Sequence, residues 1–180
     1  MNIDNMSGRT RAVVSAFLAL IVAAGGLWWA STREVSPSGL VERRAEVADR
    51  GAAVMPFDLT ETTHSFVPTP DGGQQTVTAN DLAGTEQTRL IREHLTAEAA
   101  KFAAGDFTDP ARIHGDQMPG LAELRAGAGR ITVRYEELTA GAALHYSSAD
   151  PTLVDALHRW FEAQSSDHGT DHHGTDVGLR

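Results

Sequence analysis

An uncharged apolar run near the N-terminus constrains this chain more than any other feature. Residues 12–30 read AVVSAFLALIVAAGGLWWA, nineteen residues without a charged side chain. At about 1.5 Å per residue, a helix of this length is roughly 28 Å long, close to the hydrocarbon thickness of a bilayer. The run predicts that the chain is either anchored in a membrane or exported across one. The residues that follow it are therefore expected to lie outside the cytoplasm.

The residues flanking this run favour a retained anchor. Arg9 and Arg11 precede it, which suits an N-terminus that stays in the cytoplasm. Trp28 and Trp29 end it, where aromatic side chains lie at the membrane interface. The alternative is a secretory signal cleaved at the small residues 23–25. We expect a single-pass membrane protein with its C-terminal domain outside, or else a secreted protein.

Composition narrows the possible partners. The chain has no cysteine, which excludes disulfides, thiolate metal ligands and a lipid anchor on cysteine. From Val35 onward it carries 22 acidic and 12 basic side chains, a net charge of −10. Such a surface repels nucleic acid and attracts cations or basic proteins. The expected partners are therefore the membrane through residues 12–30 and a metal ion or a basic envelope protein, with no nucleic acid.

Hydrophobic periodicity predicts an α+β domain. Two β-hairpins are each followed by a helix: 63–68 with 74–79, 85–104, 130–138 with 142–147, and 150–164. The predicted fold has two layers in ββαββα order, with an antiparallel sheet and helices on one face. Five segments are expected along the chain: a cytoplasmic segment 1–11, the anchor or signal 12–30, a stalk 31–54, a globular domain 55–164 and a disordered His-rich tail 165–180.

A weak internal repeat links the two helices. A shift of 64 residues lays Leu90 on Val154 and places the pair His94 and Glu98 on the pair His158 and Glu162. The shift favours a duplicated ββα unit; the alternative is two unrelated halves with a common architecture.

Both pairs are candidate metal ligands. Residues four apart lie on the same face of a helix, and imidazole with carboxylate ligates Zn²⁺ or Cu²⁺. If the helices are neighbours, His94, Glu98, His158 and Glu162 could form one shared site. The alternative is two ordinary surface pairs.

Other histidines offer further candidates. His114 and Met118 share the segment IHGDQMPG and suit copper; alternatively, His114 satisfies backbone groups and Met118 fills the core. His64 shares a strand face with Phe66, and a histidine on a strand is expected to be solvated or hydrogen-bonded. The polar tail predicts loose capture of a metal ion, or no role beyond solubility, through His168, His172 and His173.

Catalytic patterns are absent from the sequence. It lacks a cysteine nucleophile and the motifs G-x-S-x-G, H-E-x-x-H and G-x-x-x-x-G-K. The leading hypothesis is therefore a small extracytoplasmic domain that binds a divalent metal, copper or zinc. The alternatives are a protein-interaction module of the cell envelope and an enzyme.

Residues 55–169, about two thirds of the chain, contain the motifs MPFDLTETTH, DGGQQTV, LIREHL, GDFTDPARIHGDQMPGLAEL and LVDALHRWFEAQSSDHG. With these motifs the chain resembles a family of exported or membrane-anchored actinobacterial proteins. Members are often named aspartate carbamoyltransferase, which implies that activity but transfers no catalytic residue. That enzyme needs a two-domain fold of about twice this size and a Ser-Thr-Arg-Thr loop. Only residues 31–33 match the loop, and Glu34 follows them, so the residues disfavour this activity.

Overall fold

The computed structural model describes residues 37–168, and the predicted segment 12–30, His172 and His173 lie outside them. The chain divides into two units after Pro37, and only the second is described below. Its elements are α2 (Pro37–Ala52), η1 (Leu59–Glu61), β1 (Thr62–Thr69), β2 (Gly72–Ala79), α3 (Thr85–Ala103), α4 (Thr108–His114), α5 (Leu121–Ala126), β3 (Thr132–Leu138), β4 (Gly141–Ser147) and α6 (Pro151–His168). Within this range, no helix is long and apolar enough to cross a bilayer.

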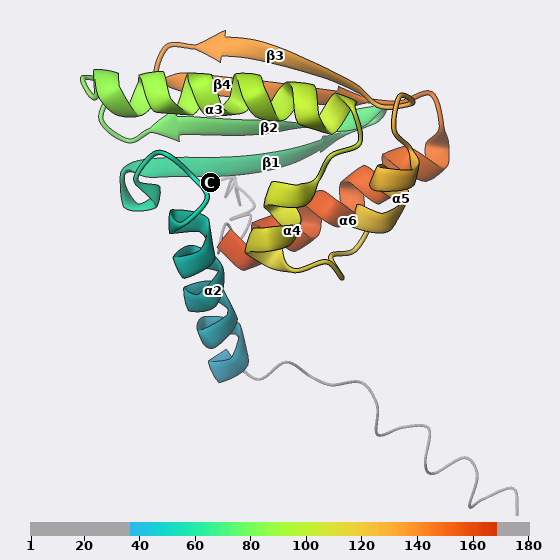
Figure 1. Ribbon diagram of the computed structural model, residues 1–180, viewed down its shortest axis with the longest axis horizontal. Coiled ribbons are helices and arrows are strands. Elements are labelled where there is room, and N and C mark those ends of the chain that lie inside the picture. The colour runs from blue at the N-terminus through green and yellow to red at the C-terminus, as the bar shows by residue number, and fades with distance from the viewer. Residues whose placement is uncertain (1–36, 169–180) are drawn as a thin grey trace, which may run out of the picture. The chain divides into compact units, whose positions relative to one another are not determined.

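The strands form one antiparallel sheet in the order β1-β2-β4-β3, which confirms both predicted hairpins. The hairpins meet where β2 pairs with β4, with Gln75 opposite Leu144. Gly73 permits close packing of a helix on this sheet, because a Cβ atom there would lie 2.3 Å from the ring of Phe161 on α6. An antiparallel sheet packed against helices confirms the predicted α+β class (Figure 1).

Helix α3 packs mainly on β3 and β4, whereas α6 packs on β1 and β2. Tyr146 on β4 contacts both Phe102 of α3 and Trp160 of α6, so the two helices reach the same side of that strand. Five aromatic side chains fill the space between the helices and the sheet. We call them the aromatic cluster: Phe102, Phe107, Tyr146, Trp160 and Phe161.

The two long helices α6 and α3 differ in how their first turns are capped. Asp150 caps α6, since its Oδ1 accepts a hydrogen bond from the backbone N–H of Thr152 at 2.9 Å. The capping position of α3 is Gly84, which has no side chain to accept a bond. Helix α3 is instead held by the burial of Ile91, Leu95 and Phe102.

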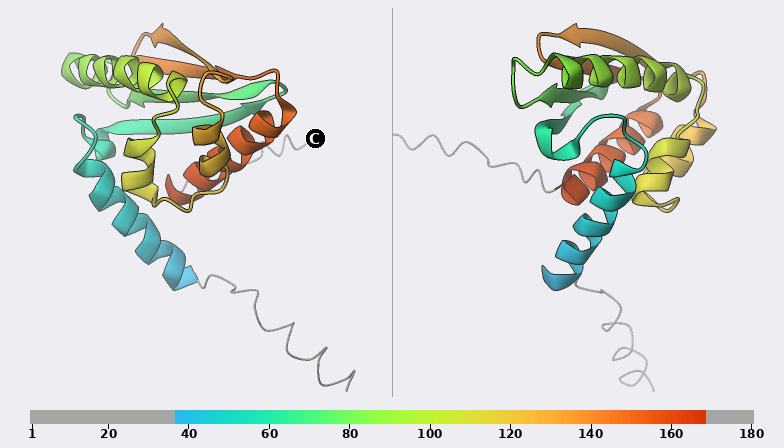
Figure 2. Two further views of the ribbon diagram at one scale, coloured as in Figure 1. Left: turned by 45° about the vertical axis from the view of Figure 1, so that its right-hand side comes forward. Right: turned by 60° about the vertical axis from the view of Figure 1, so that its left-hand side comes forward.

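The ends of the described unit are more ordered than the sequence predicts. Residues 31–54 were expected to form a stalk with at most a short exposed helix. Instead, α2 has sixteen residues, and its Val47 is only 1% exposed. Helix α6 continues to His168, past the predicted boundary at Gln164, and buries Ser165 and Asp167. Figure 2 shows α2 and the last turn of α6 on the same side of the sheet.

Candidate functional site: a buried histidine cluster beside a cleft

Three histidines from three elements meet where α2, β1, α4 and the end of α6 come together. They are His64 on β1, His114 at the end of α4 and His168 at the end of α6, and we call them the histidine cluster. The ring centroid of His168 lies 5.1 Å from that of His64 and 5.1 Å from that of His114. His168 is therefore the middle member of the cluster.

Asp167 fixes the His114 ring. The Nδ1 atom of His114 lies 2.8 Å from Oδ2 of Asp167, and both side chains are buried. Arg43 of α2 donates to both oxygens of the same carboxylate, from Nε at 2.5 Å and from Nη2 at 2.7 Å. Burial would raise the pKa of Asp167, but the hydrogen bonds from His114 and Arg43 lower it below its usual value. The carboxylate is therefore ionised at neutral pH.

His64 is buried without a hydrogen bond. Alternation along β1 places Thr62, His64 and Phe66 on the buried face of the sheet. The side chain is 8% exposed, and neither Nδ1 nor Nε2 has a hydrogen-bond partner among residues 37–168. Burial, followed by the nearby His94 and His114, lowers the pKa of His64 to about 4. Burial and the neighbouring histidines likewise lower the pKa of His168 to about 3, so both rings are neutral at pH 7.

The histidine cluster borders an open cleft. This cleft of about 390 Å³ lies between α2, β1 and the end of α6. Arg44 and Val47 line it from α2, and His64, Asp167 and His168 line it from the other side. Solutes from the solvent can therefore reach the cluster through this cleft.

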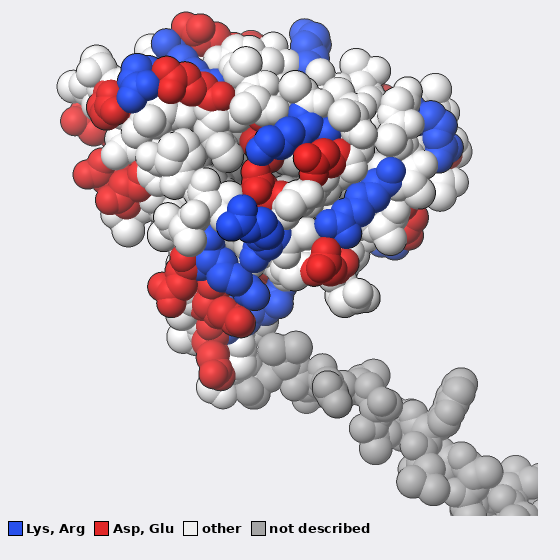
Figure 3. All heavy atoms as spheres, in the orientation of Figure 1, with Lys and Arg blue, Asp and Glu red and all other residues white. Residues whose placement is uncertain are grey.

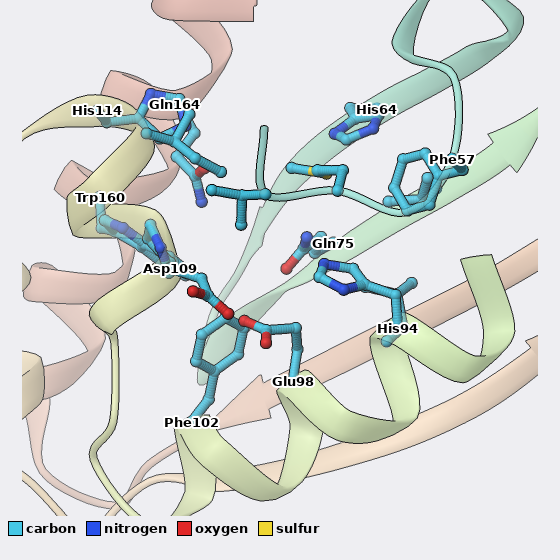
Figure 4. A pocket seen from close by; sticks show the side chains of 16 residues that line it. Phe57, His64, Gln75, His94, Glu98, Phe102, Asp109, His114, Trp160 and Gln164 are labelled. Atoms are coloured by element: carbon cyan, nitrogen blue, oxygen red, sulfur yellow. The ribbon is translucent and has the colours of Figure 1, made fainter. Parts of the chain in front are cut away.

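His64 also faces a smaller inner cavity. Figure 4 shows this cavity with His64 and His114 at one end and Glu98 with Asp109 at the other. Its free volume is about 30 Å³, enough for about one or two water molecules. His94 lines it from α3, and burial, followed by the charge of Lys101, lowers the pKa of His94.

At the far end of the inner cavity, one lysine holds two carboxylates. Lys101 Nζ donates to Glu98 at 2.8 Å and to Asp109 at 2.6 Å. Burial raises the pKa of Glu98, whereas the hydrogen bond from Lys101 lowers that of Asp109. Glu98 therefore forms a structural ion pair with Lys101.

The structure separates the four helix residues that were considered for one metal site. His94 and Glu98 line the inner cavity, whereas His158 and Glu162 line a different hollow beside Phe66. The Nε2 atom of His158 lies 2.9 Å from the backbone oxygen of Thr69. The hypothesis of one shared site on the two helices therefore has no support in this arrangement.

The remaining candidate residues differ in their surroundings. Met118 is buried in the hydrophobic core, which was the alternative to a role as a copper ligand. His114 bonds the Asp167 side chain rather than a backbone group. His64 was expected to be solvated or hydrogen-bonded, but it is buried on the face that it shares with Phe66, and its ring bonds none of the residues that the structure describes. Among residues 37–168, no group of three or more histidine, aspartate or glutamate side chains stands as a ready-formed metal site.

Charges of both signs are interspersed on the face of the molecule seen in Figure 3, and both occur along α2. No single-signed patch on this face marks a surface for nucleic acid or for a strongly charged protein.

Comparisons with protein-family models, with curated proteins and with solved structures gave no match. The function is therefore argued from the geometry of the site.

Proposed function

We propose that this protein is a membrane-anchored extracytoplasmic domain that binds one divalent transition-metal ion, zinc or copper, in the histidine cluster. The observation that carries the proposal is His64, a buried imidazole with two unpartnered ring nitrogens beside His168. A buried polar group without a partner destabilises the folded state by about 1–3 kcal/mol. A metal ion would satisfy His64 and offset that cost. Residues 12–30 would hold the domain at the membrane.

The pair formed by His114 and Asp167 supports the same ligand. In metal sites, a carboxylate commonly accepts the N–H of one ring nitrogen and leaves the other nitrogen to the metal. Asp167 contacts Nδ1 of His114, so Nε2 is the nitrogen that would ligate. The chain has no thiol to compete, and imidazole nitrogen suits both zinc and copper.

The spacing of the rings is compatible with a common ion. Metal–nitrogen bonds of about 2.0–2.1 Å at tetrahedral angles place the centroids of two ligating rings about 5 Å apart. The two measured separations from His168 are both 5.1 Å. Because the described side chains form no ready-made site, binding requires the rings to turn. His64 can turn without breaking a hydrogen bond to any part of the chain that the structure describes.

The test is calorimetric titration of the full-length chain in detergent with ZnCl₂ and with CuCl₂. We expect one site per chain. His64→Ala should lower the affinity at least about 100-fold through loss of a ligand, and Asp167→Asn about 10–100-fold through loss of ligand orientation. His145→Ala is the matched control, because this histidine bonds Glu136 on the sheet away from the cluster. Unchanged affinity in His64→Ala would refute the proposal.

A second pair of variants separates the cluster from the tail. His172→Ala combined with His173→Ala leaves the cluster intact, and we expect its stoichiometric site to persist. Loss of all binding in this double variant would leave only loose capture by the tail. It would contradict a folded site.

A further inference from the structure

We infer that α2 completes the metal site: Arg43 is a positioning residue for His114, and metal affinity depends on the docking of α2. The inference rests on the proposed function, because it names what regulates that site. The inference gives a role in metal binding to α2, although α2 supplies none of the three imidazole rings of the histidine cluster.

Arg43 contacts His114 by two routes. Its two bonds to Asp167 hold the carboxylate that in turn holds Nδ1 of His114. Its Nη2 also donates to the backbone oxygen of His114 at 3.3 Å. Without Arg43, the buried Asp167 carboxylate would lose its cationic partner and would gain by turning toward water. The His114 ring would then lose the contact that orients it.

Other described contacts between α2 and the rest of the domain involve Val47, Gly51 and Arg44. Val47 is its most buried apolar side chain, and Gly51 lies against Leu59 and Ile113. Arg44 Nε donates to the backbone oxygen of Ser166 at 3.0 Å. Most of the helix surface is exposed, and Figure 1 shows α2 extending away from the sheet. An element with so little buried surface opens at a lower free-energy cost than the core does.

Coupling of this kind works in both directions. If docked α2 strengthens metal binding by some factor, metal must favour docked α2 by the same factor. Helix α2 begins seven residues after the predicted membrane segment ends at Ala30. Forces or partners that act on the chain next to the membrane would therefore change the metal affinity of the domain.

The first test compares two neighbouring arginines in the full-length chain in detergent, titrated with Zn²⁺ against a chelator of known affinity. Arg43→Ala and Arg44→Ala each remove a bond between α2 and the end of α6, but only Arg43 bonds Asp167. We expect Arg43→Ala to weaken zinc binding about 10–100-fold and Arg44→Ala by less than about 3-fold. Equal affinities for Arg43→Ala and the wild-type chain would overturn the inference.

A second variant guards against misfolding of Arg43→Ala. Val47→Ser loosens α2 through its apolar contact and leaves the bonds between Arg43 and Asp167 chemically intact. We expect it to weaken zinc binding in the same direction. An affinity unchanged by Val47→Ser would contradict dependence on docking.

The second readout is hydrogen exchange of the amides of α2. Zinc should slow exchange in the wild-type helix by about the factor that Arg43→Ala costs in affinity, and it should not do so in Arg43→Ala. Zinc binding to the wild-type chain without slower exchange in α2 would overturn this inference and leave the proposed function standing. A wild-type chain that binds no zinc would instead refute the proposed function.

Discussion

The two halves of α6 differ in how they are stabilised. Its middle carries Trp160 and Phe161, which pack tilted against each other. Trp160 packs edge-on against Phe102, Phe107 and Tyr146, and Phe161 packs edge-on against Tyr146. Its end carries Asp167 and His168, which belong to a buried polar network. The middle of α6 stabilises the folded state through burial of apolar surface and through the packing of aromatic rings. The end must offset the desolvation of charged and polar groups, so its burial contributes less to folding than that of the middle.

The difference is clearest at single atoms. The middle of α6 contains a buried nitrogen with no hydrogen-bond partner among residues 37–168, Nε1 of Trp160, and the end of α6 lies against two more, the ring nitrogens of His64 on β1. In Trp160, a large buried ring compensates for one unbonded N–H. In His64, a smaller and more polar ring carries two nitrogens. We therefore propose a ligand for His64 and none for Trp160.

Removal of the centre of the aromatic cluster should have the largest effect on folding. We expect Trp160→Ala to lower the free energy of unfolding by about 3–5 kcal/mol, because it leaves a cavity beneath the sheet. Urea denaturation followed by circular dichroism measures this change. Arg134→Ala, at an exposed position on β3, is the control and should stay within about 0.5 kcal/mol. A loss below about 1 kcal/mol for Trp160→Ala would mean that the two ends of α6 differ less than we infer.

Acid should destabilise the metal-free protein mainly at the histidine cluster, beside the end of α6. The pKa of His64 is about 4 in the folded state and 6.5 in an ordinary environment, so the unfolded chain binds more protons between these values. Stability of the metal-free protein should therefore fall as the pH drops from about 6.5 to 4, by about 3 kcal/mol at most from this residue. His94 on α3 and His168 on α6 lie near His64, and burial lowers the pKa of both, so they share in the loss.

Denaturation at several pH values, with a chelator present, measures this dependence. The difference between the wild-type chain and His64→Leu isolates the contribution of His64, since the other acid-sensitive groups are common to both. Parallel pH profiles for the two proteins would argue that His64 is hydrogen-bonded in solution.

The smallest effect has the opposite sign. His64→Leu replaces an unpartnered polar ring by an apolar side chain at a buried position. We expect it to stabilise the metal-free protein by about 1 kcal/mol and to abolish zinc binding. His145→Leu should bring no such gain, because His145 already bonds Glu136. Destabilisation by His64→Leu would show that this ring is needed for packing.

Local rules explain why the sequence predicts the elements well. Alternation in residues 62–69 and turn residues at 70–73 specify the first hairpin without knowledge of the rest of the chain. Spacing of four residues likewise predicts that His94 and Glu98 share a face, and both line the inner cavity. These signals span a few residues each.

The histidine cluster depends on contacts that no local pattern encodes. His114 and Asp167 are 53 residues apart, and Arg43 and Asp167 are 124 apart. Helix α2 has no continuous apolar stripe because it docks through Val47 and two arginines rather than through a wide face. The sequence predicts histidine as the reactive residue type, but only the tertiary arrangement selects which histidines meet.

The crossed packing of the two helices has a consequence for the repeat. Helix α3 follows the first hairpin but covers the second, and α6 follows the second hairpin but covers the first. Each helix therefore covers the hairpin of the other ββα half. A chain severed between α3 and β3 would yield two pieces, each with an apolar strand surface bare of its cover. If the two halves do descend from one duplicated unit, that unit would have needed a second copy to cover its strands in this arrangement.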